Sequence, residues 1–200
     1  MKKNSKLVLS IVGIIIIGII VVVWIMPNDT TTYTNVDSPR PFKGNPDARV
    51  VVQEFSDFQC PACRAGAKSI NLVLEKFGDQ IKLEFKHFPL TTIHENAFNA
   101  ALASECANDQ GKFWELHDKM FDNQDSLKKD DLKLYAGQID GLDNESFSAC
   151  LDTRAEKDIV NSDVKDAENL GLRGTPTFFV NGREIENYNS LEEEIQKGLL

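Results

Sequence analysis

The chain has 200 residues, of which 42% are hydrophobic and 26% are charged, a composition that excludes wholesale disorder and a polytopic membrane protein. Its length suits one domain with an attachment segment. The formal net charge of −9 argues against a nucleic-acid partner, which would call for a basic face.

The first predicted element is an apolar segment from Leu7 to Met26, which contains no charged residue. At a rise of about 1.5 Å per residue, a helix of about 20 residues matches a hydrocarbon layer of about 30 Å, so we predict one transmembrane helix. A cleaved signal peptide is the alternative. Its apolar part is normally about 7 to 15 residues long and ends in a small-residue motif, which Trp24 to Pro27 does not supply. We therefore expect an uncleaved signal anchor within residues 1–26.

The charges that flank this segment predict its orientation. Lys2, Lys3 and Lys6 precede it, whereas no lysine or arginine follows it before Arg40. Because positive flanks stay on the cytoplasmic side, we expect a single-pass protein of the cell membrane with a cytoplasmic N-terminus and an extracytoplasmic domain. Residues 27–46, rich in Asn, Asp, Thr, Ser and Pro, are predicted to be a polar linker.

Residues 47–200 are predicted to form one α/β domain that begins with a strand, a helix and a second strand. Residues 49–55 are a valine-rich run typical of a buried strand. Residues 62–77 repeat apolar side chains with the period of a helix packed on one face. Residues 81–86 alternate between apolar and charged, as a strand with one buried face does.

A long helical region and a β-hairpin complete the domain. Asn181-Gly182 tolerates the positive φ of a hairpin turn, and Ser190 with Glu193 is predicted to form a capping box for a closing helix. The helical pieces are expected at residues 97–107, 112–121, 127–139, 146–151 and 155–170.

Two cysteines, Cys60 and Cys63, stand where the first strand gives way to the first helix. A thiol at a helix N-terminus lies among unpaired N–H groups at the positive end of the helix dipole, which lowers its pKa from about 8.5 to between about 3.5 and 7.5. Cys60 is therefore the predicted attacking thiolate. Cys63, about one helical turn later, is the predicted resolving thiol.

A zinc site and an inert structural bridge are the alternatives for this pair. Zinc needs two further ligands, and neither a second Cys-X-X-Cys nor a His-X3-His pattern occurs among the 3 histidines, so we expect no metal and no other cofactor. His87, His94 and His117 are expected to be polar surface or cap residues and not catalytic bases.

The other two cysteines, Cys106 and Cys150, fall in the helical region. An even number of cysteines in an oxidising compartment favours disulfides, and the spacing favours pairing 60 with 63 and 106 with 150. We expect the bridge between Cys106 and Cys150 to be a structural staple that closes about 45 residues and contributes roughly 4 kcal/mol. A second redox relay is the alternative.

Thr175 and Pro176 stand immediately before the hairpin. A proline there can open a strand or form a cis turn, because it cannot occupy a central ladder position. Taken alone, these residues favour a simple loop stop, since only about 5% of X-Pro bonds are cis.

The run EFSDFQCPAC from Glu54 to Cys63, followed by GTPTFFVNG from Gly174 to Gly182, resembles the DsbA-like branch of the thioredoxin superfamily. The resemblance extends over residues 45–200. It implies a thioredoxin fold with a helical insertion over residues 94–170. It also implies a cis Pro176 beside Cys60 and a Thr175 backbone that pairs with an extended substrate by strand addition.

The resemblance further implies a role for Glu54, as a buried acid that moves protons for Cys63. A solvated carboxylate at the end of the strand is the alternative for this residue. The dipeptide Pro61-Ala62, where the best-known strong oxidases of the family carry Pro-His, is expected to tune the redox potential.

The implied activity is that of a thiol-disulfide oxidoreductase that introduces disulfide bonds into exported proteins through Cys60 and Cys63. The expected partners are unfolded exported proteins with cysteines and a membrane reoxidant of the DsbB or vitamin K epoxide reductase type. A reductase or isomerase kept reduced by a membrane electron donor is one alternative. An anchored peptide-binding module with a structural bridge is the other.

Overall fold

A computed structural model describes residues 40–200, so the predicted transmembrane helix and most of the predicted linker lie outside the described residues. No helix within the described range is long and apolar enough to cross a membrane.

A five-stranded mixed sheet forms the centre of the domain, in the order β1-β3-β2-β4-β5. Strands β2 and β3 are parallel and pair from Val50 with Ile81 to Ser56 with His87, and the other neighbours are antiparallel. A parallel pair needs a crossover connection, which the first helix supplies. The strands are β1 Phe42–Gly44, β2 Val50–Ser56, β3 Ile81–His87, β4 Thr177–Val180 and β5 Arg183–Glu184.

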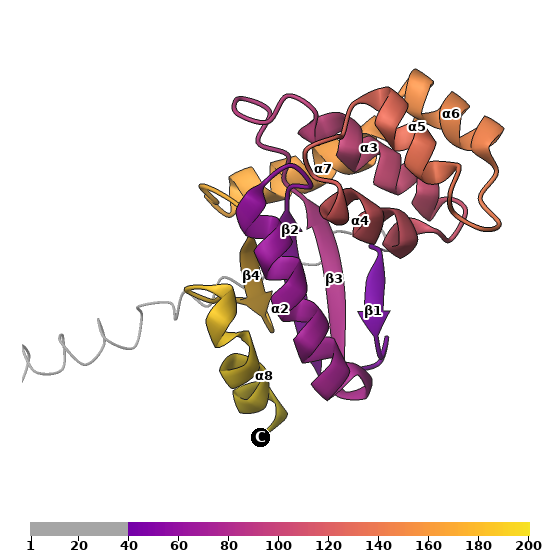
Figure 1. Ribbon diagram of the computed structural model, residues 1–200. Coiled ribbons are helices and arrows are strands. Elements are labelled where there is room, and N and C mark those ends of the chain that lie inside the picture. Colours follow the sequence, from indigo (N-terminus) through magenta and orange to yellow (C-terminus); the bar gives the residue numbers. More distant parts are fainter. Residues whose placement is uncertain (1–39) are drawn as a thin grey trace, which may run out of the picture. The chain divides into compact units, whose positions relative to one another are not determined.

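Helix α2 (Pro61–Phe77) lies along the sheet with α8 (Leu191–Leu199), and the helical insertion gathers beyond the ends of β2 and β3 (Figure 1). Two short 3-10 turns, η1 and η2, precede β3 and α8 and cover Gly78–Gln80 and Tyr188–Ser190. The insertion consists of α3 Ala97–Asn108, α4 Phe113–Asp122, α5 Lys129–Ala136, α6 Asn144–Thr153 and α7 Lys157–Asn169.

The core beneath α2 follows directly from the sequence periodicity. Val50 and Val52 alternate toward one face of β2, where they meet Ile70, Val73 and Phe77 at helical spacing on α2. All five side chains are at most 7% exposed. Burial of a side chain of this kind stabilises the fold by about 1.5 to 3 kcal/mol, so this contact fixes α2 on the sheet.

The predicted strand, helix, strand, helical insertion and hairpin are confirmed, and Asn181 and Gly182 both have positive φ. Three expectations are wrong in detail. β1 lies inside the segment predicted as linker, where it pairs with β3. Ser190 makes no side-chain capping bond. His87 and His117 are buried, at 1% and 3% exposed, because each packs among aromatic rings.

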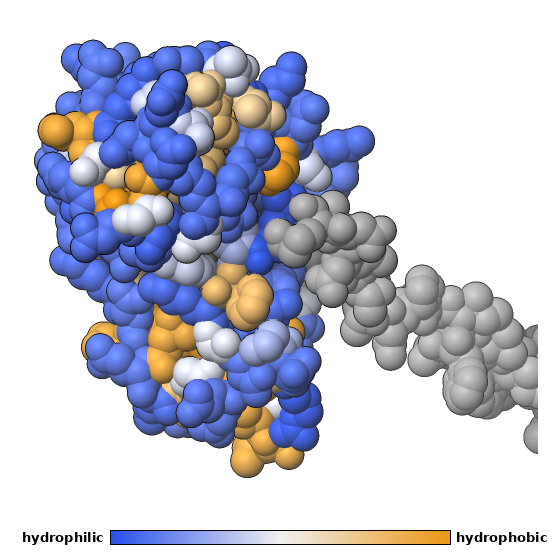
Figure 2. Space-filling view, turned by 90° about the vertical axis from the view of Figure 1, so that its right-hand side faces the viewer, coloured by the Kyte–Doolittle hydropathy of each residue, from blue (hydrophilic) through white to orange (hydrophobic). Residues whose placement is uncertain are grey.

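The face shown in Figure 2 is mainly hydrophilic, with hydrophobic side chains in separate groups. Across the described residues the exposed large hydrophobic residues lie on different elements, namely Phe42, Leu72, Ile93, Leu134 and Leu200. Scattered single side chains of this kind are ordinary on protein surfaces.

Candidate active site

Cys60 occupies the N-cap position of α2, with extended backbone at φ −79° and ψ 121°. Pro61 takes the first helical position, where its missing N–H costs no hydrogen bond. Strand β2 and the turn after it place Cys60 at the N-terminus of α2. Within this turn the Cys60 N–H donates to the Asp57 carbonyl at 3.1 Å. The cysteine is only 7% exposed. Strand and helix together therefore present its sulfur at the positive end of α2.

The surroundings of Cys60 favour its thiolate. A hydrogen bond from the Cys63 thiol is the largest of the effects that lower the pKa of Cys60 to about 5, and it outweighs the opposing effect of burial. The Thr175 hydroxyl and the backbone N–H groups of Ala62 and Cys63 lower the pKa of Cys60 further. A thiol with this pKa is almost wholly a thiolate at neutral pH, which is the nucleophilic form.

Cys63 has the opposite character. It is 0% exposed, and burial is the largest of the causes that raise its pKa far above the ordinary value of a thiol. The Asp57 N–H donates to its sulfur at 3.4 Å. Both cysteines are unbridged in this structure. The pair thus consists of one ready nucleophile and one buried thiol that keeps its proton.

The cis-proline loop lies against Cys60. The Thr175–Pro176 peptide bond is cis, and the Cys60 sulfur lies 3.4 Å from the Thr175 carbonyl oxygen. Gly66 of α2 makes this approach possible, because a Cβ at that position would lie 3.2 Å from Pro176 Cγ. Packing between α2 and the loop therefore fixes Thr175 beside the sulfur.

Glu54 is fully buried on β2, which rules out the solvated carboxylate considered as an alternative. It lies two residues from Val52 and so on the same face of β2, toward α2. Burial raises the pKa of Glu54 to about 7, and the Ser56 hydroxyl opposes part of that rise. Ser56 also lowers the pKa of Cys63 in part, so its hydroxyl lies near both groups.

Asp57 joins the cysteine loop to the loop after β3. Its carboxylate accepts from the Gln59 N–H at 2.7 Å, from the Leu90 N–H at 2.8 Å and from His94 Nδ1 at 2.8 Å. It is 1% exposed, so these bonds replace its hydration. His94 thus supports the active-site loop and does not lie free at the surface.

Gln124 reaches the same loop from the insertion. Its side-chain amide donates to the carbonyl oxygens of Phe58 and Cys60, both at 2.7 Å. The Phe58 ring packs on Phe85 and Phe121, with ring centroids 5.3 and 5.1 Å away. The segment between α4 and α5 therefore forms part of the wall of the active site.

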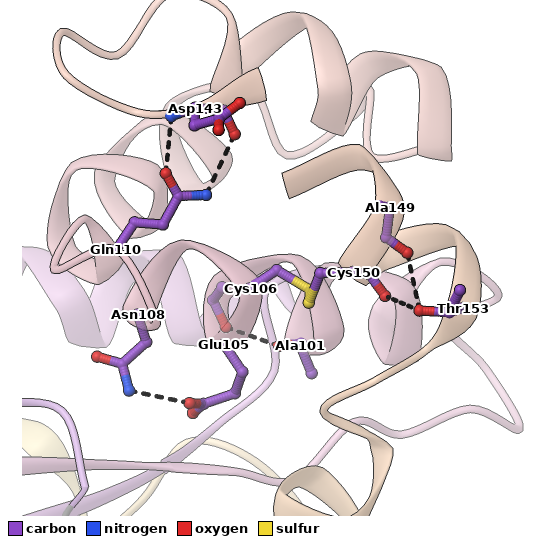
Figure 3. The surroundings of a disulfide bond; sticks show 10 residues. Ala101, Glu105, Cys106, Asn108, Gln110, Asp143, Ala149, Cys150 and Thr153 are labelled. Atoms are coloured by element: carbon purple, nitrogen blue, oxygen red, sulfur yellow. Dashed lines mark hydrogen bonds between the residues drawn. A yellow bond between two sulfur atoms is a disulfide. The ribbon is translucent and has the colours of Figure 1, made fainter. Parts of the chain in front are cut away.

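The second cysteine pair forms a disulfide between α3 and α6 (Figure 3). Cys106 and Cys150 are joined with a Cα–Cα distance of 5.8 Å, at a sequence separation of 44. Asp109 and Glu156 lie near the Cys150 sulfur. A disulfide sulfur has no thiolate to offer a metal, so this group is not a zinc site.

Replacement of both Cys106 and Cys150 by alanine is expected to lower the free energy of unfolding by about 2 to 4 kcal/mol, because the unfolded chain regains loop entropy. The rate of dithiol oxidation should be unchanged for a structural staple. Urea unfolding and an oxidation assay on the same variant measure both quantities. A slower oxidation with intact stability would favour the redox relay instead.

The structure thus places Cys60 beside Cys63, Thr175 and the cis Pro176, with Glu54 buried on the strand that leads to the cysteines, and it joins Cys106 to Cys150 within the insertion. The sequence did not point to Gln124, Asp57 or Ser56. Ser56 and Asp57 stand inside the run from Glu54 to Cys63, and this position is the local signal that marks them. Nothing local marks Gln124, which lies 64 residues from Cys60.

Comparison with known proteins assigns most of the chain to one family model. The model described as Thioredoxin matches residues 37–197. Among solved structures, "BdbD from Bacillus subtilis (oxidised)" superposes with a TM-score of 0.71 and 29% sequence identity, covering 80% of this chain and 92% of that chain. A thioredoxin-like oxidoreductase from Silicibacter pomeroyi has a TM-score of 0.72 at 23% identity, covers 85% and 96% of the two chains, and shows the fold alone.

The curated relatives carry a different name. "Na(+)/H(+) antiporter NhaA 1" from Mycobacterium sp. (strain KMS) is 40% identical over 166 residues, which cover 80% of this chain and 27% of that protein. The protein of the same name from Mycolicibacterium vanbaalenii is 42% identical over 142 residues, or 70% and 23% of the two lengths. This chain therefore spans about a quarter of the length of these relatives, whose name describes the longer protein.

Proposed function

This chain belongs to the thioredoxin family, and on this premise we propose that it is a DsbA-like thiol-disulfide oxidoreductase, which introduces disulfide bonds into exported proteins through Cys60 and Cys63. The observation that most supports oxidation of client proteins, as opposed to their reduction, is the difference in pKa between the two thiols. The pKa of Cys60 is lowered to about 5, whereas burial raises the pKa of Cys63.

The proposed reaction begins with the Cys60–Cys63 disulfide. A client thiolate attacks the Cys60 sulfur, so a bond forms between client and Cys60 while the Cys60–Cys63 bond breaks. Cys63 leaves with the electron pair and takes a proton, for which Glu54 is the proposed donor because its pKa of about 7 keeps the acid near half protonated at neutral pH. Ser56 lies near both groups and supports this transfer.

A second client thiolate then attacks the client sulfur of the mixed disulfide. The client disulfide forms, the bond to Cys60 breaks, and Cys60 leaves as a thiolate. The low pKa of Cys60 makes it a good leaving group, since a more stable thiolate departs faster. The client has lost two electrons and two protons, and the reduced enzyme has gained the two electrons.

We also propose roles for the cis-proline loop and for the dipeptide between the two cysteines. Thr175 and cis-Pro176 are the proposed substrate-binding segment, because the Thr175 carbonyl lies 3.4 Å from the Cys60 sulfur. A residue at that position can pair with an extended client beside the disulfide. Pro61 and Ala62 are the proposed dipeptide that tunes the potential.

We also propose the setting of the enzyme in the cell. Residues 1–26 form the cytoplasmic tip and single membrane anchor, a polar linker follows, and the extracytoplasmic domain begins with β1 at Phe42. Its clients are unfolded exported proteins with cysteines, and a membrane enzyme of the DsbB or vitamin K epoxide reductase type reoxidises it. The run from Leu7 to Met26, which has no charged residue and only Ser10 as a hydroxyl side chain, supports this setting.

The test of the proposed direction is the reduction potential of the Cys60–Cys63 pair, measured by equilibration with glutathione and alkylation of the free thiols. We expect a value above about −180 mV, toward the about −120 mV of a strong disulfide donor, because the stable Cys60 thiolate favours the reduced form. A value near about −270 mV would support the alternative of a reductase kept reduced by a membrane donor.

The same thiolate predicts how the stability of the reduced protein depends on pH. The pKa of Cys60 falls from 9.0 to about 5 on folding, so the folded reduced protein releases its proton more readily than the unfolded chain. The contribution of Cys60 to the stability is therefore complete above pH 9 and disappears as the pH falls through 5. Reduced protein should melt above oxidised protein at pH 7, and that difference should shrink at pH 4.

A further inference from the structure

The backbone N–H of Asp57 contacts one of the two reacting sulfurs. It donates a hydrogen bond to the Cys63 sulfur at 3.4 Å, although the two residues are 6 apart in the chain. The parallel pairing of β2 with β3 ends one residue earlier, where Ser56 lies opposite His87, so the sheet does not use this N–H. An N–H has a single hydrogen to donate, and here the Cys63 sulfur receives it.

The other polar groups of Asp57 hold this residue in place. Its carbonyl accepts from the Cys60 N–H at 3.1 Å and so closes the turn before α2. Its carboxylate accepts from one donor in the same turn and from two in the loop after β3, namely the N–H groups of Gln59 and Leu90 and Nδ1 of His94. The residue is 1% exposed. The N–H is therefore directed at the sulfur by a backbone that is fixed before any reaction occurs, as an effective electrostatic donor must be.

Cys63 is the poorer leaving group of the cysteine pair. In the proposed reaction a client thiolate attacks Cys60, and the electron pair of the broken disulfide goes to the Cys63 sulfur. Cys63 is 0% exposed, so water does not solvate the developing charge, and burial raises the pKa of its thiol. A thiol of high pKa leaves slowly. The first exchange step therefore depends on the donors that the protein supplies to this sulfur.

The structure shows the Cys63 sulfur in the unbridged form, which is the form that exists after the disulfide has broken. The Asp57 N–H lies at hydrogen-bond distance in that form. A hydrogen bond to a charged acceptor is roughly twice as strong as one to a neutral acceptor, so this bond strengthens as the thiolate forms. Such a bond lowers the barrier because it stabilises the transition state more than the starting disulfide.

We propose that the Asp57 N–H is a catalytic donor in thiol-disulfide exchange, which stabilises the Cys63 sulfur as it leaves as a thiolate. The N–H keeps its hydrogen throughout. The bond between client and Cys60 forms, the Cys60–Cys63 bond breaks, and Glu54 remains the proposed source of the proton that neutralises Cys63. The proposal rests on the proposed function and deepens it. It also gives the loop after β3 a part in the chemistry, since that loop binds the Asp57 carboxylate.

The test compares two variants that both lose the carboxylate. Asp57→Ala retains the N–H, whereas Asp57→Pro removes it, because proline has no backbone N–H. In the oxidised full chain in detergent, Asp57→Pro should oxidise a dithiol peptide about tenfold more slowly than Asp57→Ala. This loss is smaller than the about 100-fold loss typical of an oxyanion donor, since sulfur is a weaker acceptor. The comparison reports on the N–H, because the loss of the carboxylate and of its charge is common to both variants.

A second reaction provides a control in which the sulfur of residue 63 takes no part. In a Cys63→Ser background, glutathione releases the peptide from its mixed disulfide with Cys60. Asp57→Pro and Asp57→Ala should release the peptide at the same rate, because the leaving thiolate is then not the one that the N–H contacts. A purely structural effect of the proline would slow both the oxidation and the release by the same factor.

Two results would overturn the role of the N–H and leave the proposed function intact. One is an equal oxidation rate in Asp57→Pro and Asp57→Ala, and the other is an equal slowing of oxidation and release in Asp57→Pro. If the wild-type protein does not oxidise the peptide, the proposed function itself is wrong. Should Asp57→Pro fail to fold, an ester bond in place of the Ser56–Asp57 peptide bond, introduced by semisynthesis, removes the same N–H and keeps the side chain. The ester protein is then compared with the wild type in the same two reactions.

Discussion

Replacement of Cys60 by serine is expected to reduce the rate of dithiol oxidation to below about one thousandth of the wild-type rate, because a serine hydroxyl cannot form the mixed disulfide. Cys60 is the proposed attacking sulfur because it lies at the start of α2 and because its pKa is lowered to about 5. The assay is the oxidation of a peptide with two cysteines by the oxidised protein, followed by the loss of free thiols.

Cys63→Ser is the matched variant for this experiment, since it retains the Cys60 thiolate and removes the resolving thiol. Reduced Cys63→Ser protein should accumulate a mixed disulfide with a disulfide-containing peptide, visible as a mass increase that dithiothreitol reverses. Oxidation of the dithiol peptide by Cys60→Ser protein at the native rate would exclude the mechanism. It would favour an anchored peptide-binding module in which the cysteine pair is only a structural bridge.

Replacement of Glu54 by glutamine is expected to remove a pH dependence of the stability worth about 3 kcal/mol, because burial raises the pKa of Glu54 from 4.5 to about 7. The folded protein holds this proton more tightly than the unfolded chain does. Its contribution is therefore complete below pH 4.5 and is lost as the pH rises through 7. The wild type should lose this stability between pH 4.5 and pH 8, and Glu54→Gln should not.

The measurement is urea unfolding of the oxidised protein at these two pH values. Oxidised protein is the proper form because its Cys60 has no thiol to titrate. Glu75→Gln, on the exposed face of α2, is the control and should leave the stability close to that of the wild type at both pH values. An equal loss of stability in Glu54→Gln and wild type would show that another group causes the pH dependence.

The proposed role of Glu54 as proton donor also predicts a change in the rate of thiol-disulfide exchange, which the stability measurement does not test. Glu54→Gln keeps the shape of the side chain but cannot give up a proton to the leaving Cys63 thiolate. Formation of the mixed disulfide should become slower at neutral pH, while the pKa of Cys60 should change little. The rate of mixed-disulfide formation and the pKa of Cys60, measured together, distinguish a role of Glu54 in proton transfer from an effect of its buried charge alone.

Local sequence patterns are sufficient to predict several elements of this protein. The valine-rich β2, the helical period of α2 and the turn at Asn181-Gly182 are confirmed within one or two residues. These patterns are decisive because burial of one face imposes a period of 2 on strands and 3.6 on helices. Cys60 and Cys63 were identified for the same reason, since the strand, the cysteines and the helix are consecutive in the chain.

The environment of the cysteines, in contrast, depends on contacts between segments that are distant in the sequence. The Thr175 carbonyl lies beside Cys60 across 115 residues, and Gln124 reaches the same loop across 64. Hydrophobic periodicity predicts neither contact, because each depends on how the hairpin and the insertion pack on α2. Burial of Glu54, His87 and His117 likewise depends on the helices and strands packed over them. Hydrophobic periodicity predicts which residues face inward. The hydrogen-bond partners of a buried polar group, however, come from segments that are distant in the sequence.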